Sequence, residues 1–531
     1  MAVRRSFWLA LMVVIAASAP YVGTLDHDLL SDDPSLVREV ERLYQEGGLR
    51  RILTADFRLF PTVPLGYYRP VVLLSIWVDT RIGIPPPLSY HATNLLLHVV
   101  NSVLVLLIAR NLLRSDAAAL LSGLLFAVHP VHVDAVAPIA GRTDLWSAMF
   151  ILLATLAWSS DAERIRPMPF WILLVGSVAV VLSALSKELG FLGPMVLGIW
   201  HIVYHYSRGG AKKVLSMRRP WLLAWSVGLG IAITLRWLAV GFRGVDTPLA
   251  ARGDLGLYIG IWARYFRLLL MPWPLNAFYT PDQVSLDVLT GLAAVAVLVL
   301  YASLSIRRYD HIGIIALVWT VIFLMPVSGI VTLPAAVLAE RFLYVPSAIF
   351  CISLGLILHH AWSVMRSRRM VAMAITFIFM AACTLTYARC RDWHDPLSFY
   401  LSLVHTSPRY AGGFDGLGQA LEQLGRRDEA FTVYKKSLDL DPGRASSYNS
   451  LGVLLANSEE FGESVPLFRK AVLLDPRFTE ARMNLGAACL ALRDRSCAIE
   501  QIEALRSLDA EAAARLQALI AEGDLRDRAS R

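Results

Sequence analysis

Residues 92–113 read ATNLLLHVVNSVLVLLIARNLL, an apolar run in which Arg110 is the only charged residue. A helix needs about 20 mostly apolar residues to cross a bilayer, and it satisfies its own backbone hydrogen bonds in lipid. This run therefore predicts a membrane-spanning helix. The same criterion predicts ten more spans, at residues 7–24, 117–137, 144–160, 170–186, 189–206, 221–240, 286–305, 312–330, 342–361 and 370–388.

Charges are distributed unevenly along the 531 residues. Residues 391–531 contain 18 Lys/Arg and 21 Asp/Glu, whereas the longer part before them contains 32 and 21. The whole chain is 56% hydrophobic and 17% charged, against roughly 45–50% and 25% for soluble domains. The sequence thus predicts an all-α protein, with a polytopic membrane domain at 1–390 and a soluble domain after it. We expect no nucleic-acid partner, because the soluble part has no cluster of basic residues.

Positive charge near span ends predicts the orientation, since Lys and Arg are retained on the cytoplasmic side. With the N-terminus in the cytoplasm, every inner connection holds at least two Lys or Arg residues, from the one at Arg4 to the one at Arg369. The long first loop, 25–90, and the soluble domain then lie outside the cytoplasm.

One further stretch resembles a span, and one of the predicted spans has a second interpretation. Residues 258–275 are apolar, but they contain Arg264 and Arg267, so we expect them at the membrane surface. The first span also has the pattern of a signal peptide, with small residues at 17–19. Pro20, directly after the cleavage point that this pattern would imply, disfavours cleavage.

The soluble domain, 391–522, repeats with a period of 34 residues, which is typical of tetratricopeptide repeats. Three full repeats follow a half-repeat that begins at Asp395-Pro396, with a capping helix and a polar tail after them. The repeats are 409–442, 443–476 and 477–510, the capping helix is 511–522, and the tail is 523–531. Such an α-solenoid offers a concave face to a peptide or a partner protein, and the alternative is a structural spacer.

The five cysteines do not have a metal-binding spacing. Cys351 and Cys383 fall in predicted spans, where cysteine is a small apolar residue. Cys489 and Cys497 fall on the two helices of the third repeat, on the oxidising side in this orientation. A disulfide between these two is therefore a hypothesis.

Ionisable residues gather at the outer ends of the predicted spans. Such residues are costly in lipid and usually functional, so they are candidate site residues. A carboxylate among several cations suits transfer of a group from an anionic carrier, because the carboxylate acts as base and the cations neutralise a departing phosphate. The candidates are Asp26, Asp28, Arg69, His91, His129, His132, Asp134, Arg142, Lys187, Glu340, Arg341 and Tyr344.

Structural explanations compete with these roles. His129, His132 and Asp134 suggest a metal site, but Pro130 interrupts the helix and the spacing fixes no third ligand, so no metal is predicted. Glu340-Arg341 and Lys187-Glu188 could each be a self-compensating pair. Asp32 and Asp33 in the first loop are expected to be solvated, with Asp33 as a helix cap before Pro34.

Four stretches, in this order and ahead of the repeats, resemble one known family. They are YYRPVVLLSIWVDTRIGIPPPLSYHATNLLLH from residue 67, FAVHPVHVDAVAPIAGRTDLWSA from 126, SKELGFLGP from 186 and VLAERFLYVPSA from 337. The chain is similar here to the transmembrane and tetratricopeptide repeat-containing O-mannosyltransferases, of the GT-C glycosyltransferase class. The resemblance covers nearly the whole chain.

The resemblance implies a GT-C-like membrane domain and an activity. The donor is a polyprenyl-phosphate-linked sugar, typically mannose, and the acceptors are Ser or Thr residues of exported proteins, with inversion at the anomeric carbon. An acid just after the first span serves as base in this class. Counting back from Pro34, Asp26 falls on the second of the two acids of the family pattern, and Asp28 is a rival.

The predicted mechanism is a single displacement. Asp26, or otherwise Asp28, takes the hydroxyl proton while the lipid phosphate leaves toward Arg341, Lys187 and the other cations, so no cofactor or metal is required. The rivals are a lipid-linked oligosaccharide ligase and a non-catalytic membrane-anchored scaffold. With 44 Arg against 6 Lys, the composition favours a bacterial inner membrane, with the first loop and the repeats in the periplasm.

Overall fold

The computed structural model describes residues 2–57, 67–161, 169–206, 219–241, 255–285, 288–307, 311–327 and 338–529. The chain divides into two compact units, Met1–Asp395 and Pro396–Arg531. Both consist of helices in the described ranges, and the only β pairing there is an isolated bridge between Phe57 and Tyr67.

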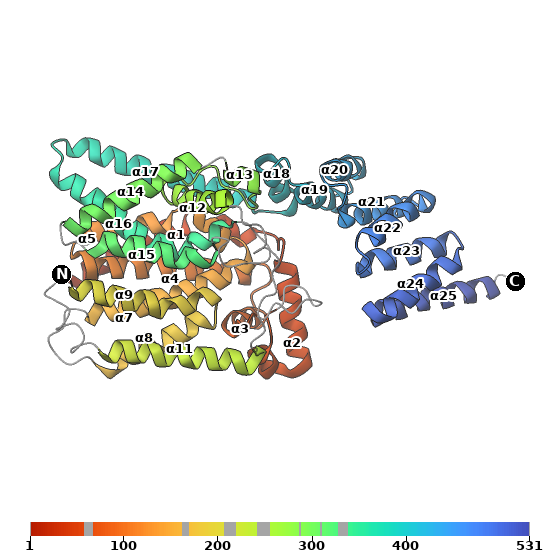
Figure 1. Cartoon of the computed structure of the whole chain (residues 1–531), viewed down its shortest axis with the longest axis horizontal. Coiled ribbons are helices and arrows are strands. Elements are labelled where there is room, and N and C mark those ends of the chain that lie inside the picture. Colours follow the sequence, from red (N-terminus) through yellow and green to blue (C-terminus); the bar gives the residue numbers. More distant parts are fainter. Residues whose placement is uncertain are drawn as a thin grey trace. The chain divides into compact units, whose positions relative to one another are not determined.

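Each of the eleven predicted spans corresponds to a helix in the first unit, as the apolar runs require. Helix α4 packs against α5 and α7, α5 packs against α16, and α7 packs against α8, so α4 and α5 lie inside the bundle. Most of these helices run side by side in Figure 1. Their bounds are α1 Ala2–Ser18, α4 Leu88–Leu113, α5 Asp116–Ala127, α7 Arg142–Asp161, α8 Phe170–Ala184, α9 Gly193–Tyr206, α11 Arg219–Val240, α14 Val288–Arg307, α15 His311–Leu324, α16 Tyr344–Val364 and α17 Arg368–Asp392.

Five helical segments in the described part are long and apolar enough to cross a membrane without a break. They are Leu88–Leu113, Ile139–Ser160, Pro220–Val240, Glu340–Val364 and Arg368–Asp392. A further helix pair, Asp116–Ala127 and Pro130–Val136, is apolar enough when taken together but is bent by 47°, as in a broken span or a re-entrant loop. The bend falls at His129-Pro130, because proline lacks the amide hydrogen that would continue the helix. The chain is therefore an integral membrane protein.

Short 3₁₀ turns and two helices gather at one end of this bundle. The turns η2 and η7 pack against each other, and η4 contacts α7 and α9. Helix α2 (Asp33–Thr54) lies across the end of the bundle beside α3 (Pro70–Asp79) (Figure 1). The remaining elements of the unit are η1 Val22–Asp26, η2 Pro130–His132, α6 Val133–Val136, η3 Ile139–Gly141, η4 Glu188–Leu192, α12 Leu255–Leu270, α13 Pro281–Ser285, η6 Met325–Val327 and η7 Glu340–Leu343.

The second unit is a series of helix pairs. Gly418 and Gly452 lie against the rings of Tyr434 and Phe468, where a Cβ would collide, which explains the glycine that recurs with the 34-residue period. Gly486 instead lies against Leu516 of the last helix. The helices are α18 Pro396–Thr406, α19 Ala411–Gln423, α20 Arg427–Leu440, α21 Ala445–Ala456, α22 Phe461–Leu474, α23 Thr479–Ala491, α24 Arg495–Leu508 and α25 Ala510–Ala529.

Two predictions for this unit have clear outcomes. The structure joins Cys489 on α23 and Cys497 on α24 by a disulfide, with their Cα atoms 6.0 Å apart. Most of residues 523–531, predicted as a polar tail, belong to helix α25, which continues to Ala529.

Candidate functional site

The outer-end residues of the prediction converge, although they are far apart in the sequence. The site lies where η2, η4, η7 and the start of α7 meet. It contains Arg69, Asp134, Asp144, Lys187 and Arg341. Three cation–carboxylate pairs form there, and no partner in these pairs is a sequence neighbour of the other. The self-compensating pairs Glu340-Arg341 and Lys187-Glu188 are not formed, so that alternative is wrong.

Arg69 and Glu188 form the first pair. The Arg69 Nε lies 3.2 Å from both carboxylate oxygens and its second terminal nitrogen lies 2.5 Å from Oε2, a bidentate contact. The guanidinium also stacks over the rings of Phe57 and Tyr67, at 4.9 and 4.5 Å from their centroids. Burial alone raises the pKa of Glu188, but Arg69 outweighs it, and the net pKa is lowered. Glu188 therefore stays charged.

Lys187 and Asp144 form the second pair, with Nζ 2.6 Å from Oδ1. Both side chains are buried, and the ammonium also lies 4.8 Å from the centroid of the Phe342 ring. Burial lowers the pKa of Lys187, Asp144 raises it, and the cations Arg69 and Arg341 lower it further, with a lowered pKa as the result. The Lys187 ammonium therefore interacts electrostatically with Asp144, Arg69 and Arg341.

Arg341 and Asp134 form the third pair, which is the loosest. The Arg341 backbone N–H donates to Asp134 Oδ2 at 2.9 Å, whereas the guanidinium lies 3.5 Å from Oδ1. The Arg341 side chain is 37% exposed, but Asp134 is only 2% exposed. Arg341 is therefore the cation of this site with most capacity to bind an incoming anion, and Asp134 positions it.

Arg142, predicted to bind the donor phosphate, lies apart from these three pairs in a buried position of its own. Its side chain is completely buried, and one terminal nitrogen pairs with Asp79 at 2.5 Å. The other nitrogens donate to Asn94 Oδ1 at 2.9 Å and to the Tyr90 carbonyl at 2.7 Å. Because its donors are used and none of its surface is accessible, Arg142 ties α3, α4 and α7 together.

Glu340, another predicted site residue, is buried and contacts protein groups in this structure. Its side chain is inaccessible to solvent and its Oε1 accepts from the Asn276 backbone N–H at 2.5 Å and from the Tyr279 hydroxyl at 2.6 Å. Its other oxygen faces Arg389 at 3.6 Å. These contacts fix η7, and so hold the neighbouring residue Arg341.

Three further predicted site residues, His129, His132 and Tyr344, belong to a buried hydrogen-bonded network. His132 Nε2 lies 2.7 Å from Ser347 Oγ, and His129 Nε2 lies 3.2 Å from the Leu269 carbonyl. The Tyr344 hydroxyl lies 2.9 Å from Nδ1 of His98, whose Nε2 lies 3.0 Å from the Ala127 carbonyl. This network holds the bent helix pair against α16.

The predicted bases Asp26 and Asp28 are exposed, at the end of η1 and just after it. Neither carboxylate forms a hydrogen bond or an ion pair with another described residue. His27 between them is buried, with its ring centroid 5.9 Å from that of His91 and 5.5 Å from that of His394. Burial, followed by His91 and His394, lowers the pKa of His27 to about 3.

Asp32 and Asp33 are not solvated as the sequence predicts. Asp33 is buried at the first turn of α2, and its carboxylate accepts from the Ala140 backbone N–H at 2.8 Å; burial raises its pKa to about 7 against the effect of such backbone donors. Asp32 is half-buried and lies within electrostatic range of Arg341; burial raises its pKa and Arg341 lowers it, with a raised pKa as the result. Asp32 is therefore the first-loop carboxylate that the structure brings to the cations. No sequence pattern identified it.

Comparison with known proteins supports both halves of the prediction. The tetratricopeptide repeat family matches residues 414–444 and again 444–474. Protein O-mannosyl-transferase Tmtc1 of Drosophila melanogaster is 26% identical, over 80% of this chain and 60% of its own length. Protein O-mannosyl-transferase TMTC4 of Homo sapiens is 28% identical, over 81% of this chain and 66% of its own length. The resemblance to this family is confirmed.

These relatives are longer than the chain, which spans less than two thirds of Tmtc1 and TMTC4. Among solved structures, the chain is similar to the apo crystal structure of the Archaeoglobus fulgidus oligosaccharyltransferase. That similarity has a TM-score of 0.48 and 13% identity, over 76% of this chain and 58% of the other.

Proposed function

We propose that this chain is a membrane glycosyltransferase that moves a sugar, mannose, from a polyprenyl-phosphate donor to Ser or Thr hydroxyls of exported proteins. Two lines of support meet. The curated relatives are named protein O-mannosyl-transferases. The observation that carries the proposal is the position of Arg341, a half-exposed cation beside Lys187 and Arg69 at the end of the bundle.

The role of the cations follows from the chemistry of the leaving group. A lipid phosphate gains negative charge as the glycosidic bond breaks, and preorganised cations stabilise that charge. Arg341 contacts the phosphate, because its guanidinium is accessible, while Lys187 and Arg69 contribute through the field of the cluster. A phosphate is a weak base, so its departure needs no general acid.

The acceptor hydroxyl needs a base on the opposite side of the sugar from the phosphate. The family pattern assigns Asp26, with Asp28 as rival. We assign the role to Asp32 first, because it is a half-buried first-loop carboxylate within electrostatic range of Arg341; in this assignment the sugar lies between Asp32 and the phosphate held by Arg341. Asp26 is the second candidate, and its exposure leaves it open to an acceptor peptide.

The test uses purified full-length protein in nanodiscs, a polyprenyl-phosphate mannose donor and a Ser/Thr-rich peptide. We expect Asp32→Asn to lower kcat for transfer by about 10²–10⁴-fold, the usual contribution of a positioned base. Glu46→Gln on α2, an exposed carboxylate outside the cluster, is the matched control and should be as active as the wild type.

Each other outcome has a definite meaning. Loss of transfer in Asp26→Asn with full activity in Asp32→Asn would return the base to the family position. Release of a pyrophosphate carrier, with transfer of an oligosaccharide, would identify a ligase. Failure of the wild type to transfer any lipid-linked sugar would leave a scaffold and discard the proposal.

The repeat unit and the orientation complete the proposal. We propose that the concave face of the repeats binds the acceptor protein or a partner, and that this unit and the first loop lie in the periplasm of a bacterium. The binding role is supported by the tetratricopeptide matches, since such solenoids offer a concave face to a partner. The orientation follows from the distribution of Lys and Arg between the connections. Cysteine labelling of intact cells at an exposed position such as Ser507 tests the side of the membrane.

A further inference from the structure

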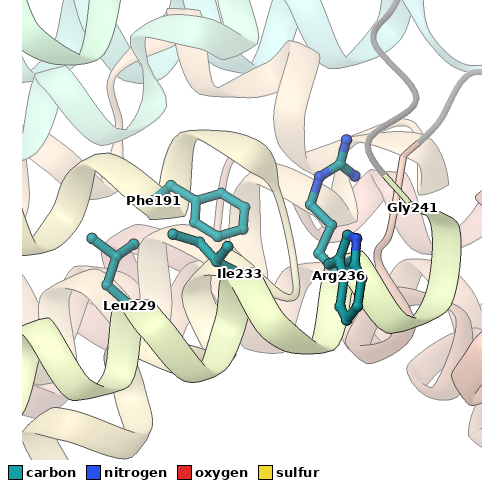
Figure 2. A pocket seen from close by; sticks show the side chains of 6 residues that line it. Phe191, Leu229, Ile233, Arg236 and Gly241 are labelled. Atoms are coloured by element: carbon teal, nitrogen blue, oxygen red, sulfur yellow. The ribbon is translucent and has the colours of Figure 1, made fainter.

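An apolar recess lies on the side of the membrane unit, between η4 and α11. It has a volume of about 410 Å³ and is lined by Phe191, Leu229, Ile233, Arg236, Trp237 and Gly241. Figure 2 shows Phe191 of η4 facing Leu229 and Ile233 of α11, with the Arg236 guanidinium farther along the same side of the helix. A recess of this size falls in the range of ligand-binding pockets.

The helix that lines most of the recess has few protein contacts. Residues 229, 233, 236 and 237 are spaced at intervals that place them on one face of a helix. Segment Pro220–Val240 is one of the long apolar spans, and only 17% of its apolar window is buried inside the protein. Leu238, on another face of α11, is 68% exposed, as a lipid-facing residue should be. An apolar hollow on such a helix suits a hydrocarbon chain.

Arg236 places a cation at one end of this hollow. A charge within a span is costly, which marks it as a functional candidate, although a long side chain can also reach the membrane surface on its own. Its surroundings favour the functional interpretation. Tyr67 lies within electrostatic range of Arg236, Arg69 and Glu188, and the Arg69 guanidinium stacks on the Tyr67 ring. Tyr67 therefore links the end of the recess to the cation cluster of the candidate site.

We infer that the recess holds the first isoprene units of the polyprenyl-phosphate donor, with Arg236 contacting its phosphate on the way to Arg341. The inference rests on the proposed function for the identity of the lipid. We choose an isoprenoid phosphate as the ligand because the recess has an apolar wall and one cation, Arg236. Tyr67 connects Arg236 with the cation cluster of the candidate site. Ordinary anionic phospholipids also have apolar chains and a phosphate, and the competition experiment below distinguishes them from polyprenyl phosphate.

The experiment measures binding without transfer. Full-length protein in phosphatidylcholine nanodiscs is exposed to a diazirine-bearing polyprenyl phosphate that carries no sugar, and labelled peptides are identified by mass spectrometry. We expect label on peptides that contain Phe191 and Ile233. Unlabelled polyprenyl phosphate should compete for labelling, and phosphatidylglycerol at the same concentration should not.

Two variants test the recess itself. Ile233→Trp fills it from a position that is already 46% exposed, and should reduce labelling about tenfold. Leu238→Trp adds the same ring to the other face of α11 and should label as the wild type does. Arg236→Gln should raise KM for the donor more than it lowers kcat, because in this inference Arg236 contacts the phosphate while the donor binds and Arg341 contacts it when the bond breaks.

The outcomes separate this inference from the proposed function. Equal labelling of Ile233→Trp and Leu238→Trp, or equal competition by phosphatidylglycerol, overturns the recess as the isoprenoid site while transfer activity stands. Specific labelling of the recess in a protein that transfers no sugar supports the recess and rejects the transferase.

Discussion

Several ion pairs of the two units differ in the sequence separation of their partners and in their exposure. In the membrane unit, Arg341 pairs with Asp134 across 207 residues and Arg69 pairs with Glu188 across 119. In the repeat unit, Arg426 pairs with Glu429 three residues on, and Arg515 with Glu511 four residues back. Pairs of the first kind are buried or half-buried and hold segments together, whereas those of the second kind lie on exposed helix surfaces.

This difference has an energetic reason. A surface pair three or four residues apart contributes little, because water screens both charges. A buried ion that loses its partner costs several kcal/mol, because it remains unsolvated. Long-range buried pairs such as Arg142 with Asp79 therefore help to specify tertiary contacts in the membrane unit. The repeat unit has a long-range pair of its own, Arg444 with Asp415, and the membrane unit also has exposed local pairs such as Arg42 with Glu46.

The largest effect is expected at the buried pair of Arg142 and Asp79. Asp79→Ala leaves a fully buried guanidinium without its anion, and should destabilise the unit by about 3–5 kcal/mol. Folded yield and thermal unfolding in detergent measure this. The double variant Asp79→Leu/Arg142→Met should recover part of the loss, because it removes both charges. Glu429→Gln, the control in the repeat unit, should not change the unfolding temperature.

Arg341 is expected to affect activity and leave stability unchanged. Its guanidinium has one long side-chain contact and is 37% exposed, so Arg341→Gln should fold normally. Loss of one preorganised charge partner of a transition state usually costs about 10²–10³ in kcat. Initial rates of sugar transfer measure the effect, with Arg81→Gln, an exposed arginine just after the end of α3, as control. Equal loss in both variants would mean that general surface charge, and not this site, is responsible.

The disulfide tests the repeat unit. It closes a short loop of separation 8, for which chain entropy gives at most about 2.5 kcal/mol. We expect Cys489→Ser to increase hydrogen exchange in the third repeat of the full chain without altering exchange in the membrane unit. Mass spectrometry of unreduced wild-type protein that found two free thiols would contradict the bond.

The effect with the most gradual onset concerns Asp33 and pH. Its pKa is raised to about 7 in the folded protein from an ordinary 3.8, chiefly by burial. The folded state therefore binds this proton more tightly, and stability should fall as pH rises from about 4 to 7, by up to about 1.4 kcal/mol per pH unit. Thermal unfolding from pH 5 to 8 checks this. Asp33→Asn should remove the decline, and a decline that persists in that variant belongs to another group.

The sequence predicts the positions of the helices well, but it does not predict which side chains are accessible. Apolar runs located α4 and α16, and the 34-residue period located the repeat helices, because both signals are local. The same reasoning placed Arg142 and Glu340 among the substrate ligands and left Asp32 in solvent. Accessibility depends on residues such as Asp79, Asn276 and Tyr279, which carry no recognisable pattern.

The sequence by itself determined an all-α membrane protein with a tetratricopeptide array, the end of the bundle where ionisable residues gather, and the pairing of Cys489 with Cys497 as a hypothesis. These follow from hydrophobic period and charge count, which are properties of short segments. Only the tertiary structure decided that Arg341 remains accessible while Arg142 is enclosed, and that Asp32 lies near the cations. The reason is physical, since a buried charge is satisfied by whichever partner the fold brings near, and that partner can lie 200 residues away.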